Sequence, residues 1–363
     1  MSSNFSSIFQ GKKMKFKNRI SAFSEFSGQK SFLKSKPAEI NIEITSFCNL
    51  SCPMCGRVSK NTPSAYMSIE LFKSIIDQVK GYAELVFLSA GVGEPISHPQ
   101  LNEMLKYCEK FNLKTLVSTN ATLLNEKKIN LLLDNPPDQL ILSLDGATKE
   151  THESIRIGSK FEKTMSNVLN LCKSKLERKL SKPFIIAQMI YMEENEAEAA
   201  HFYKKWKLTK GINAVRIKRM NFVKGSAFDK QDVSVVNIDL LKGKKNKQDL
   251  IERSPSCFYP WRQMVISAKG DIGLCCRDHN FIFKSGNIRN DSIENLWNSK
   301  NLMEARRLIA GGFKNKIDLC NGCDGIQLNS ATGVAVRFFN ANSIHKIAPM
   351  LETFSIKMKK KIW

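Results

Sequence analysis

Three cysteines stand close together near the start of the chain, in the segment CNLSCPMCGR. Cys48, Cys52 and Cys55 have the spacing CxxxCxxC, so their thiolates converge only if the backbone loops around a metal. Three soft ligands leave a fourth coordination position empty. A structural zinc site would need a distant fourth ligand, whereas a [4Fe–4S] cluster would keep one iron open to another molecule. We favour the cluster, because structural zinc usually closes with a second local pair.

A second set of cysteines lies toward the other end of the chain. Cys257 and Cys275 flank a predicted hairpin, Cys276 follows directly, and Cys320 and Cys323 form a CxxC pair. Four thiolates can close a tetrahedral zinc site or hold a fully ligated [4Fe–4S] cluster. Their spacing leaves both alternatives open.

The other cysteines and two histidines are weaker candidates. Cys108 and Cys172 share helix faces with leucines, so we expect them in the core, where cysteine behaves as a small hydrophobe. His201 lies beside Phe202 in a predicted helix and is expected to be structural or solvated. His279 lies near the second cysteine set, where a histidine could accept a proton.

Alternating strands and helices must position these residues. Six strands alternating with helices predict a parallel sheet with crossover helices, which is an α/β fold. Six units are fewer than the eight of a full TIM barrel, so periodicity allows an open sheet or an incomplete barrel. The strands are expected at 38–45, 83–90, 113–120, 138–145, 184–192 and 214–220, and the helices at 68–82, 98–111, 125–135, 161–180 and 196–208.

The alternation of predicted strands and helices stops after residue 220. A second, small cysteine-bearing domain is predicted, with a hairpin over 261–276 and a helix over 292–312 that ends at a glycine. We therefore divide the chain into a basic N-terminal extension, a barrel domain, a linker, a cysteine domain and a basic tail, at 1–37, 38–220, 221–256, 257–325 and 326–363.

The CxxxCxxC motif after the first strand resembles the radical S-adenosylmethionine (SAM) superfamily. The resemblance implies a partial (β/α)6 TIM-like barrel in which Cys48, Cys52 and Cys55 hold a [4Fe–4S] cluster. In that family the fourth iron chelates the amino and carboxylate groups of SAM. Reduction then breaks SAM, and the 5′-deoxyadenosyl radical abstracts a substrate hydrogen.

Short segments at successive strand ends extend this resemblance. GVGEP (91–95) resembles the family's GGEP segment with Val92 as a departure, and STN (118–120) and SLDG (143–146) resemble segments near SAM and its ribose. Two further departures affect the adenine contacts: Met54 replaces a residue that is often aromatic, and the fifth strand lacks glycines. The implied SAM-binding residues are Gly91, Gly93 and Glu94 for the amino group, Ser118 and Asn120, Ser143 and Asp145 for the ribose, and Arg156 for the carboxylate.

The second cysteine set resembles the shortened SPASM, or twitch, extension of radical SAM enzymes. The order of cysteine, GDIGLCC turn, GNI, Leu-Trp helix and CxxC carries this resemblance. It implies an auxiliary [4Fe–4S] cluster. The implied ligands are Cys257, Cys275, Cys320 and Cys323, with Cys275 preferred to Cys276 because it directly follows Gly-Asp-Ile-Gly-Leu.

The amino-acid composition indicates a globular protein and suggests the compartment in which it works. Of the 363 residues, 42% are hydrophobic and 25% are charged, which is ordinary for a globular protein and argues against disorder of the whole chain. Neither a transmembrane stretch nor a secretory signal is evident. The ten cysteines therefore indicate a reducing, cytoplasmic compartment, where clustered cysteines bind metals more often than they form disulfides.

A net charge of +22 favours an acidic partner or an anionic membrane surface, but no motif predicts sequence-specific nucleic-acid binding. The N-terminal extension mixes lysines with phenylalanines that keep no single helical period. We favour a strap that packs on the barrel over an amphipathic segment lying on a membrane. The phenylalanines are Phe5, Phe9, Phe16, Phe23, Phe26 and Phe32.

The resemblance predicts a radical SAM oxidoreductase whose auxiliary cluster accepts an electron from a carbohydrate or another small polar substrate. It also implies a reducing partner such as flavodoxin or ferredoxin. One alternative is a maturase acting on a ribosomally made peptide. An alternative of another class is a non-catalytic zinc protein that binds nucleic acid, which the open three-cysteine site and the GVGEP segment disfavour.

Overall fold

The computed structural model describes residues 2–56, 64–219, 257–321 and 323, without the side chains of residues 2–13 and of residue 219. The predicted linker at 221–256 and basic tail at 326–363, as well as the side chains of Phe5 and Phe9, lie outside this description.

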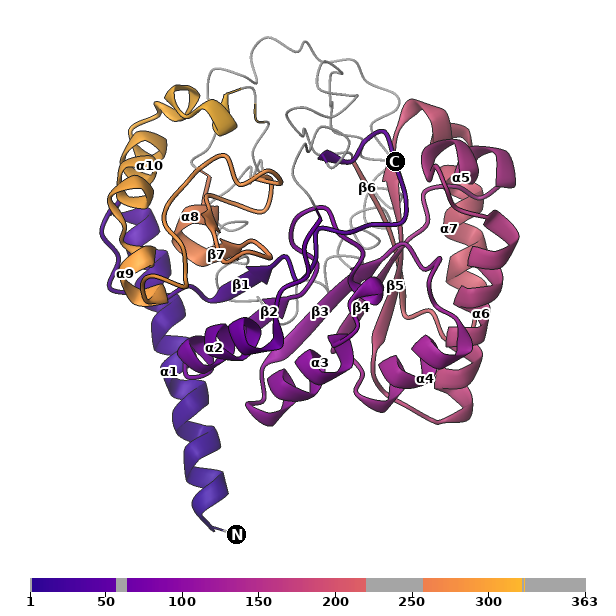
Figure 1. The fold of residues 1–363 in the computed structure, drawn as a ribbon, viewed down its shortest axis with the longest axis horizontal. Coiled ribbons are helices and arrows are strands. Elements are labelled where there is room, and N and C mark those ends of the chain that lie inside the picture. Colours follow the sequence, from indigo (N-terminus) through magenta and orange to yellow (C-terminus); the bar gives the residue numbers. More distant parts are fainter. Residues whose placement is uncertain (1, 57–63, 220–256, 322, 324–363) are drawn as a thin grey trace, which may run out of the picture.

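One curved sheet with helices on its outer side forms the body of the molecule (Figure 1). Its eight strands have the order β6-β5-β4-β3-β2-β1-β7-β8, and all pairs are parallel except β7 with β8. This confirms the predicted α/β fold with a parallel sheet. The strands are β1 Glu39–Ile42, β2 Leu85–Phe87, β3 Lys114–Thr119, β4 Gln139–Ser143, β5 Phe184–Tyr191, β6 Ala214–Arg219, β7 Gln263–Ile266 and β8 Ile272–Gly273.

Amphipathic helices cover the outer face, and polar residues fix where several of them begin. The side chain of Ser68 accepts a hydrogen bond from the Leu71 N–H, which confirms it as the N-cap of α2. Cys108 and Cys172 are buried in this layer, as predicted. The helices are α2 Ile69–Val79, α3 Leu101–Lys110, α4 Glu126–Asp134, α5 Lys149–Ile155, α6 Phe161–Glu177 and α7 Ala199–Leu208. The short α5 was not predicted from the sequence.

The inner face of the sheet is apolar at one end of the strands and polar at the other. Leu85, Leu116, Ile141 and Ile186 pack together across β2 to β5. Residues two positions further along the strands point to the same face, and at those positions the side chains are polar. Because the strands are parallel, their carboxyl ends meet at one edge, where ligands bind in such folds. That polar set is Ser118, Ser143, Gln188, Arg216 and Lys218.

The predicted hairpin forms, but it continues the main sheet rather than starting a separate one. Strand β7 pairs in parallel with β1, in the register Glu39 with Gln263 to Ile42 with Ile266. All four residues of β7 are buried, as expected of a strand with neighbours on both sides. The two cysteine-bearing regions are therefore joined through adjacent strands.

The helix predicted over 292–312 is interrupted. Two helices, α9 Ile293–Trp297 and α10 Lys300–Ala310, replace it. The side chain of Ser299 accepts from the Leu302 N–H and begins α10, because a serine at this position competes for backbone donors and favours a cap. A short helix, α8 Tyr259–Arg262, precedes β7.

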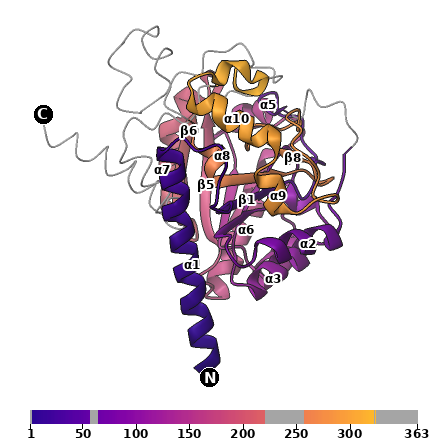
Figure 2. The same ribbon diagram turned by 90° about the vertical axis from the view of Figure 1, so that its left-hand side faces the viewer.

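The N-terminal extension combines a helix and a strap. Helix α1, Ser2–Ser27, projects away from the body at its N-terminal end in both views (Figures 1 and 2), whereas no helix was predicted there. Phe23 and Phe26 pack on the core, but the side chain of Phe16 is exposed. Residues 28–37, which follow α1, form the strap. The indole N–H of Trp261 donates to the Lys30 carbonyl at 2.8 Å, and that of Trp297 donates to the Ser35 carbonyl at 2.9 Å. In the part of the chain that is described, no helix is both long and apolar enough to cross a membrane.

Candidate active site

The first cysteine loop follows β1 and packs with apolar residues at the carboxyl edge of the sheet. Cys52 is buried, and its carbonyl accepts a hydrogen bond from the Cys55 N–H at 3.0 Å, which forms a turn. Apolar residues from the loop and from segments far along the chain pack against the three cysteines, of which Cys52 is buried and Cys48 and Cys55 are partly exposed. The apolar residues are Leu50, Met54, Ile155, Ile190 and Met192.

Two of the predicted SAM-binding residues contact the cysteine sulfurs. The Asn120 side-chain amide donates to Cys48 Sγ at 3.8 Å, and the Arg156 guanidinium donates to Cys52 Sγ at 3.8 Å. Donors of this kind stabilise a thiolate. Burial raises the pKa of Cys48 to about 11, so its thiol needs a bound metal to ionise near neutral pH.

The glycines of the GVGEP segment are required by the packing of the chain itself. A Cβ on Gly93 would lie 1.8 Å from the carbonyl oxygen of Thr45, and one on Gly91 would lie 2.1 Å from Glu43 Oε2. Gly91 also has φ +76°, a conformation that favours glycine. Both glycines therefore let the loop after β2 lie directly against the end of β1.

Glu94 is buried and tightly held. Its carboxylate accepts from the Ile96 N–H at 3.0 Å, the Thr119 hydroxyl at 2.7 Å and the Asn120 N–H at 2.7 Å. Burial raises the pKa of this carboxyl, and the same hydrogen bonds oppose that rise. The structure thus places Glu94 as a fixed carboxylate that joins the loop after β2 to the end of β3.

Asp145 and Arg156 form a buried ion pair behind the cysteine loop. Asp145 is completely buried and has φ +55°. One of its carboxylate oxygens pairs with the Arg156 guanidinium, and the other accepts a hydrogen bond from the Ile190 N–H at 2.6 Å. Arg156 follows α5 and links this carboxylate to Cys52. The resemblance implies a ribose contact for Asp145 and a SAM carboxylate contact for Arg156, and in this structure the two side chains bind each other. Ser118 and Ser143 meet at 3.3 Å on the neighbouring strands.

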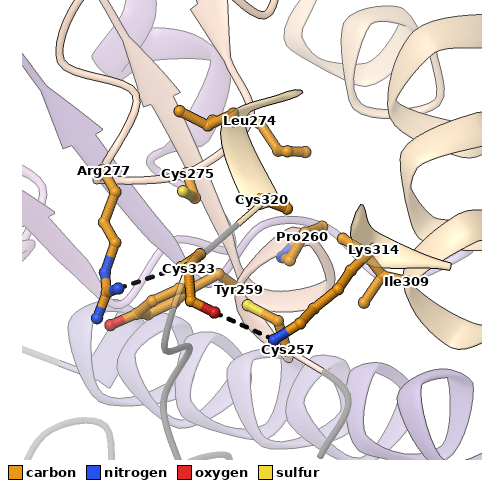
Figure 3. A pocket seen from close by; sticks show the side chains of 11 residues that line it. Cys257, Tyr259, Pro260, Leu274, Cys275, Arg277, Ile309, Lys314, Cys320 and Cys323 are labelled. Carbon is orange, nitrogen blue, oxygen red and sulfur yellow. Dashed lines mark hydrogen bonds between the residues drawn. The ribbon is translucent and has the colours of Figure 1, made fainter. Parts of the chain in front are cut away.

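The second cysteine set lines one pocket beside α8, β8 and α10 (Figure 3). Cys257, Cys275, Cys320 and Cys323 all face this pocket, and Cys276 is not among its lining residues. Burial is the main reason that the thiol pKa values are raised, to about 11 for Cys257 and about 12 for Cys320. Neighbouring cysteine thiols raise both pKa values further.

Two cationic side chains border this pocket, and the sequence reasoning assigned no role to either. The Arg277 guanidinium donates to Cys323 Sγ at 3.1 Å, and the Lys314 ammonium donates to the Cys323 carbonyl at 3.1 Å (Figure 3). The position of Arg277 directly after Cys275-Cys276 was a signal that could have identified it. Lys314 carries no recognisable sequence signal.

The number and type of the donors fit iron–sulfur clusters. Three thiols at the first site match a four-iron cluster with one open iron, and four thiols at the second site match a fully ligated cluster. A structural zinc ion takes the same soft thiolates but closes with four protein ligands, which the three cysteines of the first site do not supply.

Comparisons with known proteins find matches to both cysteine-bearing regions of the chain. Residues 42–205 match the model of the radical SAM superfamily, and residues 257–324 match the SPASM model, described as an iron–sulfur cluster-binding domain. The chain is 29% identical over 185 residues to AdoMet-dependent heme synthase of Methanosarcina barkeri, a match that covers 50% of each protein. It therefore spans about half the length of that relative.

Two other relatives match over more of the chain. The subtilosin biosynthesis protein AlbA of Bacillus subtilis is 26% identical and the match covers 85% of this chain and 70% of AlbA. The 2-deoxy-scyllo-inosamine dehydrogenase of Niallia circulans is 19% identical, covering 80% of this chain and 94% of the enzyme.

Solved structures show the same fold at low identity. BtrN in complex with AdoMet and 2-DOIA has a TM-score of 0.53 and 17% identity, over 81% of this chain and 95% of BtrN. Streptococcus suis SuiB bound to the precursor peptide SuiA has a TM-score of 0.59 and 17% identity, over 78% of this chain and 69% of SuiB.

Proposed function

Since the chain belongs to the radical SAM superfamily and carries an SPASM iron–sulfur domain, we propose that it is an oxidoreductase with two [4Fe–4S] clusters. With both clusters and SAM bound, it would cleave SAM reductively, remove a hydrogen atom from a carbohydrate or another small polar substrate, and pass the remaining electron to the auxiliary cluster while the substrate releases a proton. Cys48, Cys52 and Cys55 would hold the radical SAM cluster, and the auxiliary ligands would be Cys257, Cys275, Cys320 and Cys323.

One observation carries this proposal: the three-cysteine loop and the pocket lined by four thiols follow strands of one sheet, and the strands that lead into them are paired directly. Strand β1 leads into the first loop, and its neighbour β7 leads through β8 into Cys275. A second electron-transfer centre at this place suits a reaction that removes two electrons from one substrate.

The residues of the chain have distinct tasks in this function. When bound, the clusters and SAM supply the one-electron and radical chemistry. Asn120 and Arg156 hydrogen-bond the ligand sulfurs, which orients them and favours the thiolate form. Asp145 fixes Arg156, and Glu94 presents a rigid negative charge suited to the SAM ammonium group. The apolar residues around Cys52 keep water from the reacting groups.

Specific observations also support a peptide substrate. AlbA, named for bacteriocin biosynthesis, matches 85% of this chain, and SuiB in the structure with its precursor peptide gives the higher TM-score of the two reported. A peptide maturase is therefore the second candidate, with the same two clusters. In either case we propose a flavodoxin or ferredoxin as electron donor and a reducing, cytoplasmic setting.

Reductive SAM cleavage tests the enzyme class directly. Anaerobically reconstituted protein would be incubated with dithionite and SAM, and 5′-deoxyadenosine would be measured by chromatography. We expect product from the wild type and from the control Cys172→Ala, which removes a core cysteine, and none from the triple variant Cys48/Cys52/Cys55→Ala. Zinc-loaded protein that forms no product would instead favour a non-catalytic metal-binding protein. Candidate carbohydrates and precursor peptides would then be ranked by how far each stimulates the reaction.

A further inference from the structure

Arg306 of α10 is a charged side chain that is completely buried. Within the described part of the chain, its guanidinium donates only to uncharged oxygens and packs over the Trp297 ring. The acceptors are the carbonyls of Pro260 at 2.9 Å, Ser31 at 3.0 Å and Trp297 at 2.7 Å, and the side-chain oxygen of Asn298 at 3.3 Å. Buried charges are normally paired, so this cation stands beside a place where an anion is expected.

Glu25 is the carboxylate whose charge acts on Arg306, but its oxygens are held by the strap. They accept hydrogen bonds from the Lys34 N–H at 2.8 Å and the Ser35 N–H at 3.2 Å. Burial lowers the pKa of Arg306 to about 9, so the guanidinium keeps its charge at neutral pH although that charge is poorly compensated.

The pocket lined by four cysteines lies directly beside Arg306. Pro260, whose carbonyl accepts from the Arg306 Nε–H, lines this pocket, and so does Ile309, about one turn further along α10 (Figure 3). Four thiolates around a [4Fe–4S] core give a centre with a net negative charge, and reduction makes it more negative. When loaded, the pocket would therefore supply the negative charge that the buried guanidinium lacks.

Lys314 brings a second cation to the same pocket. Its side chain lines the pocket, and its ammonium donates to the Cys323 carbonyl at 3.1 Å (Figure 3). Among the described residues that line the pocket, none is aspartate or glutamate. Asp278 lies in the loop after β8, but its carboxylate accepts from the backbone N–H groups of Leu274 and Ile282, at 3.3 and 2.9 Å. The charges at this pocket therefore suit an anionic occupant.

We propose that Arg306 and Lys314 are the charge partners of the auxiliary cluster, which hold the segments that carry its ligands and raise its reduction potential. Arg306 holds Pro260, which closely follows Cys257, and Lys314 holds Cys323. Nearby cations favour the more negative, reduced form of the cluster. Neither side chain touches a reacting atom, so both are positioning residues. This inference rests on the proposed function, and it gives the auxiliary centre a potential suited to accepting the substrate electron.

An EPR-monitored redox titration tests the proposal on the auxiliary cluster alone. The parent protein would be the full chain with Cys48/Cys52/Cys55→Ala, which lacks the ligands of the first cluster. Arg306→Gln and Lys314→Gln would be added to it singly, because an amide still donates to a carbonyl but carries no charge. At a fixed potential, we expect each variant to lower the ratio of reduced to oxidised cluster about tenfold, which is a shift of about 59 mV for a one-electron couple.

Matched controls lie close to both residues in the sequence. Arg307 is exposed and pairs with Glu304, and Lys316 lies over the exposed ring of Phe313. Arg307→Gln and Lys316→Gln remove the same charges away from the pocket lining and are expected to leave the potential unchanged. Arg306→Lys keeps the charge and is expected to keep most of the parent's potential.

Three results would overturn the proposal: a parent that binds no iron, an unchanged potential in both pocket variants, or an equal shift in the controls, which would show a general effect of net charge. Iron content is counted for every variant. If Arg306→Gln assembles no cluster, Lys314→Gln decides, and a potential equal to that of the parent then overturns the proposal.

The chain with both cysteine sets intact tests the enzyme class separately. If it binds iron but forms no 5′-deoxyadenosine from SAM, the proposed function fails. The redox titration would still decide whether Arg306 and Lys314 are charge partners of the auxiliary cluster.

Discussion

Replacing Arg156 with methionine removes the guanidinium that neutralises the buried Asp145 carboxylate. The side chain of Asp145 has 0% exposure and that of Arg156 has 12%, so water cannot replace the lost partner. The Ile190 N–H would remain as a donor to Asp145. Breaking one partner of a buried ion pair costs about 3–5 kcal/mol, and we expect Arg156→Met to lower the free energy of unfolding by about this amount.

A double-mutant cycle separates this pair from a general packing defect. Asp145→Asn alone leaves a buried cation and is expected to cost a similar amount, while its amide oxygen still accepts from Ile190. The double variant buries neither charge, so its cost should fall short of the sum by about 0.5–3 kcal/mol. Lys73→Met is the control, because its ion pair with Glu103 is exposed and should change stability little.

Urea unfolding of the metal-free, reduced chain provides the assay, since bound iron would add its own binding free energy. Tryptophan fluorescence reports the transition through the buried Trp206, Trp261 and Trp297. Additive single-variant effects, or an Arg156→Met cost as small as that of Lys73→Met, would refute the assignment of Asp145 and Arg156 as a coupled buried pair.

Three further predictions concern the second cysteine site. Cys275→Ser should lower the iron content by about four per chain, and Cys276→Ser should leave it unchanged, because only Cys275 of these two faces the pocket. Iron analysis that gives the reverse pattern would overturn this choice of ligand. Arg277→Met removes the donor to Cys323 Sγ and should lower the reduction potential of the auxiliary cluster by about 60 mV, because that hydrogen bond stabilises the more negative, reduced cluster. An unchanged potential in an EPR-monitored redox titration would contradict this prediction. Burial raises the pKa of Asp278 to about 6, so the folded chain retains a proton that the unfolded chain releases, and stability is lost as pH rises from about 4 to about 6. Asp278→Asn should remove that slope from urea midpoints of the metal-free chain, and an unaltered slope would show that another group causes it.

The sequence predicted the parallel sheet because each unit has a local signature. The strand at 138–145 has an apolar centre, Leu140 to Leu142, and the helix that begins after Ser68 has both a cap and an apolar face. The position of β7 has no such signature. Its pairing with β1 joins residues 222 apart or more in sequence, as the contact between Asn41 and Gln263 shows, and no local pattern specifies that register.

The candidate site was predictable to the extent that residue type and spacing express it. Cysteine spacing indicated both metal sites, and the strand-end positions brought Glu94 and Asn120 to one place. Pairing choices were not predictable: the sequence cannot show that Arg156 binds Asp145, because that contact depends on the turn after β4 and the short α5.

Iron and acid-labile sulfide counts on anaerobically reconstituted protein test the central claim most directly. The wild type should bind about eight irons and eight sulfides, and two complementary variants, Cys48/Cys52/Cys55→Ala and Cys257/Cys320/Cys323→Ala, should each bind about four. This result would establish two independent four-iron clusters on the residues named here. Bound zinc without iron, or a wild type whose iron is lost completely in either variant, would contradict it.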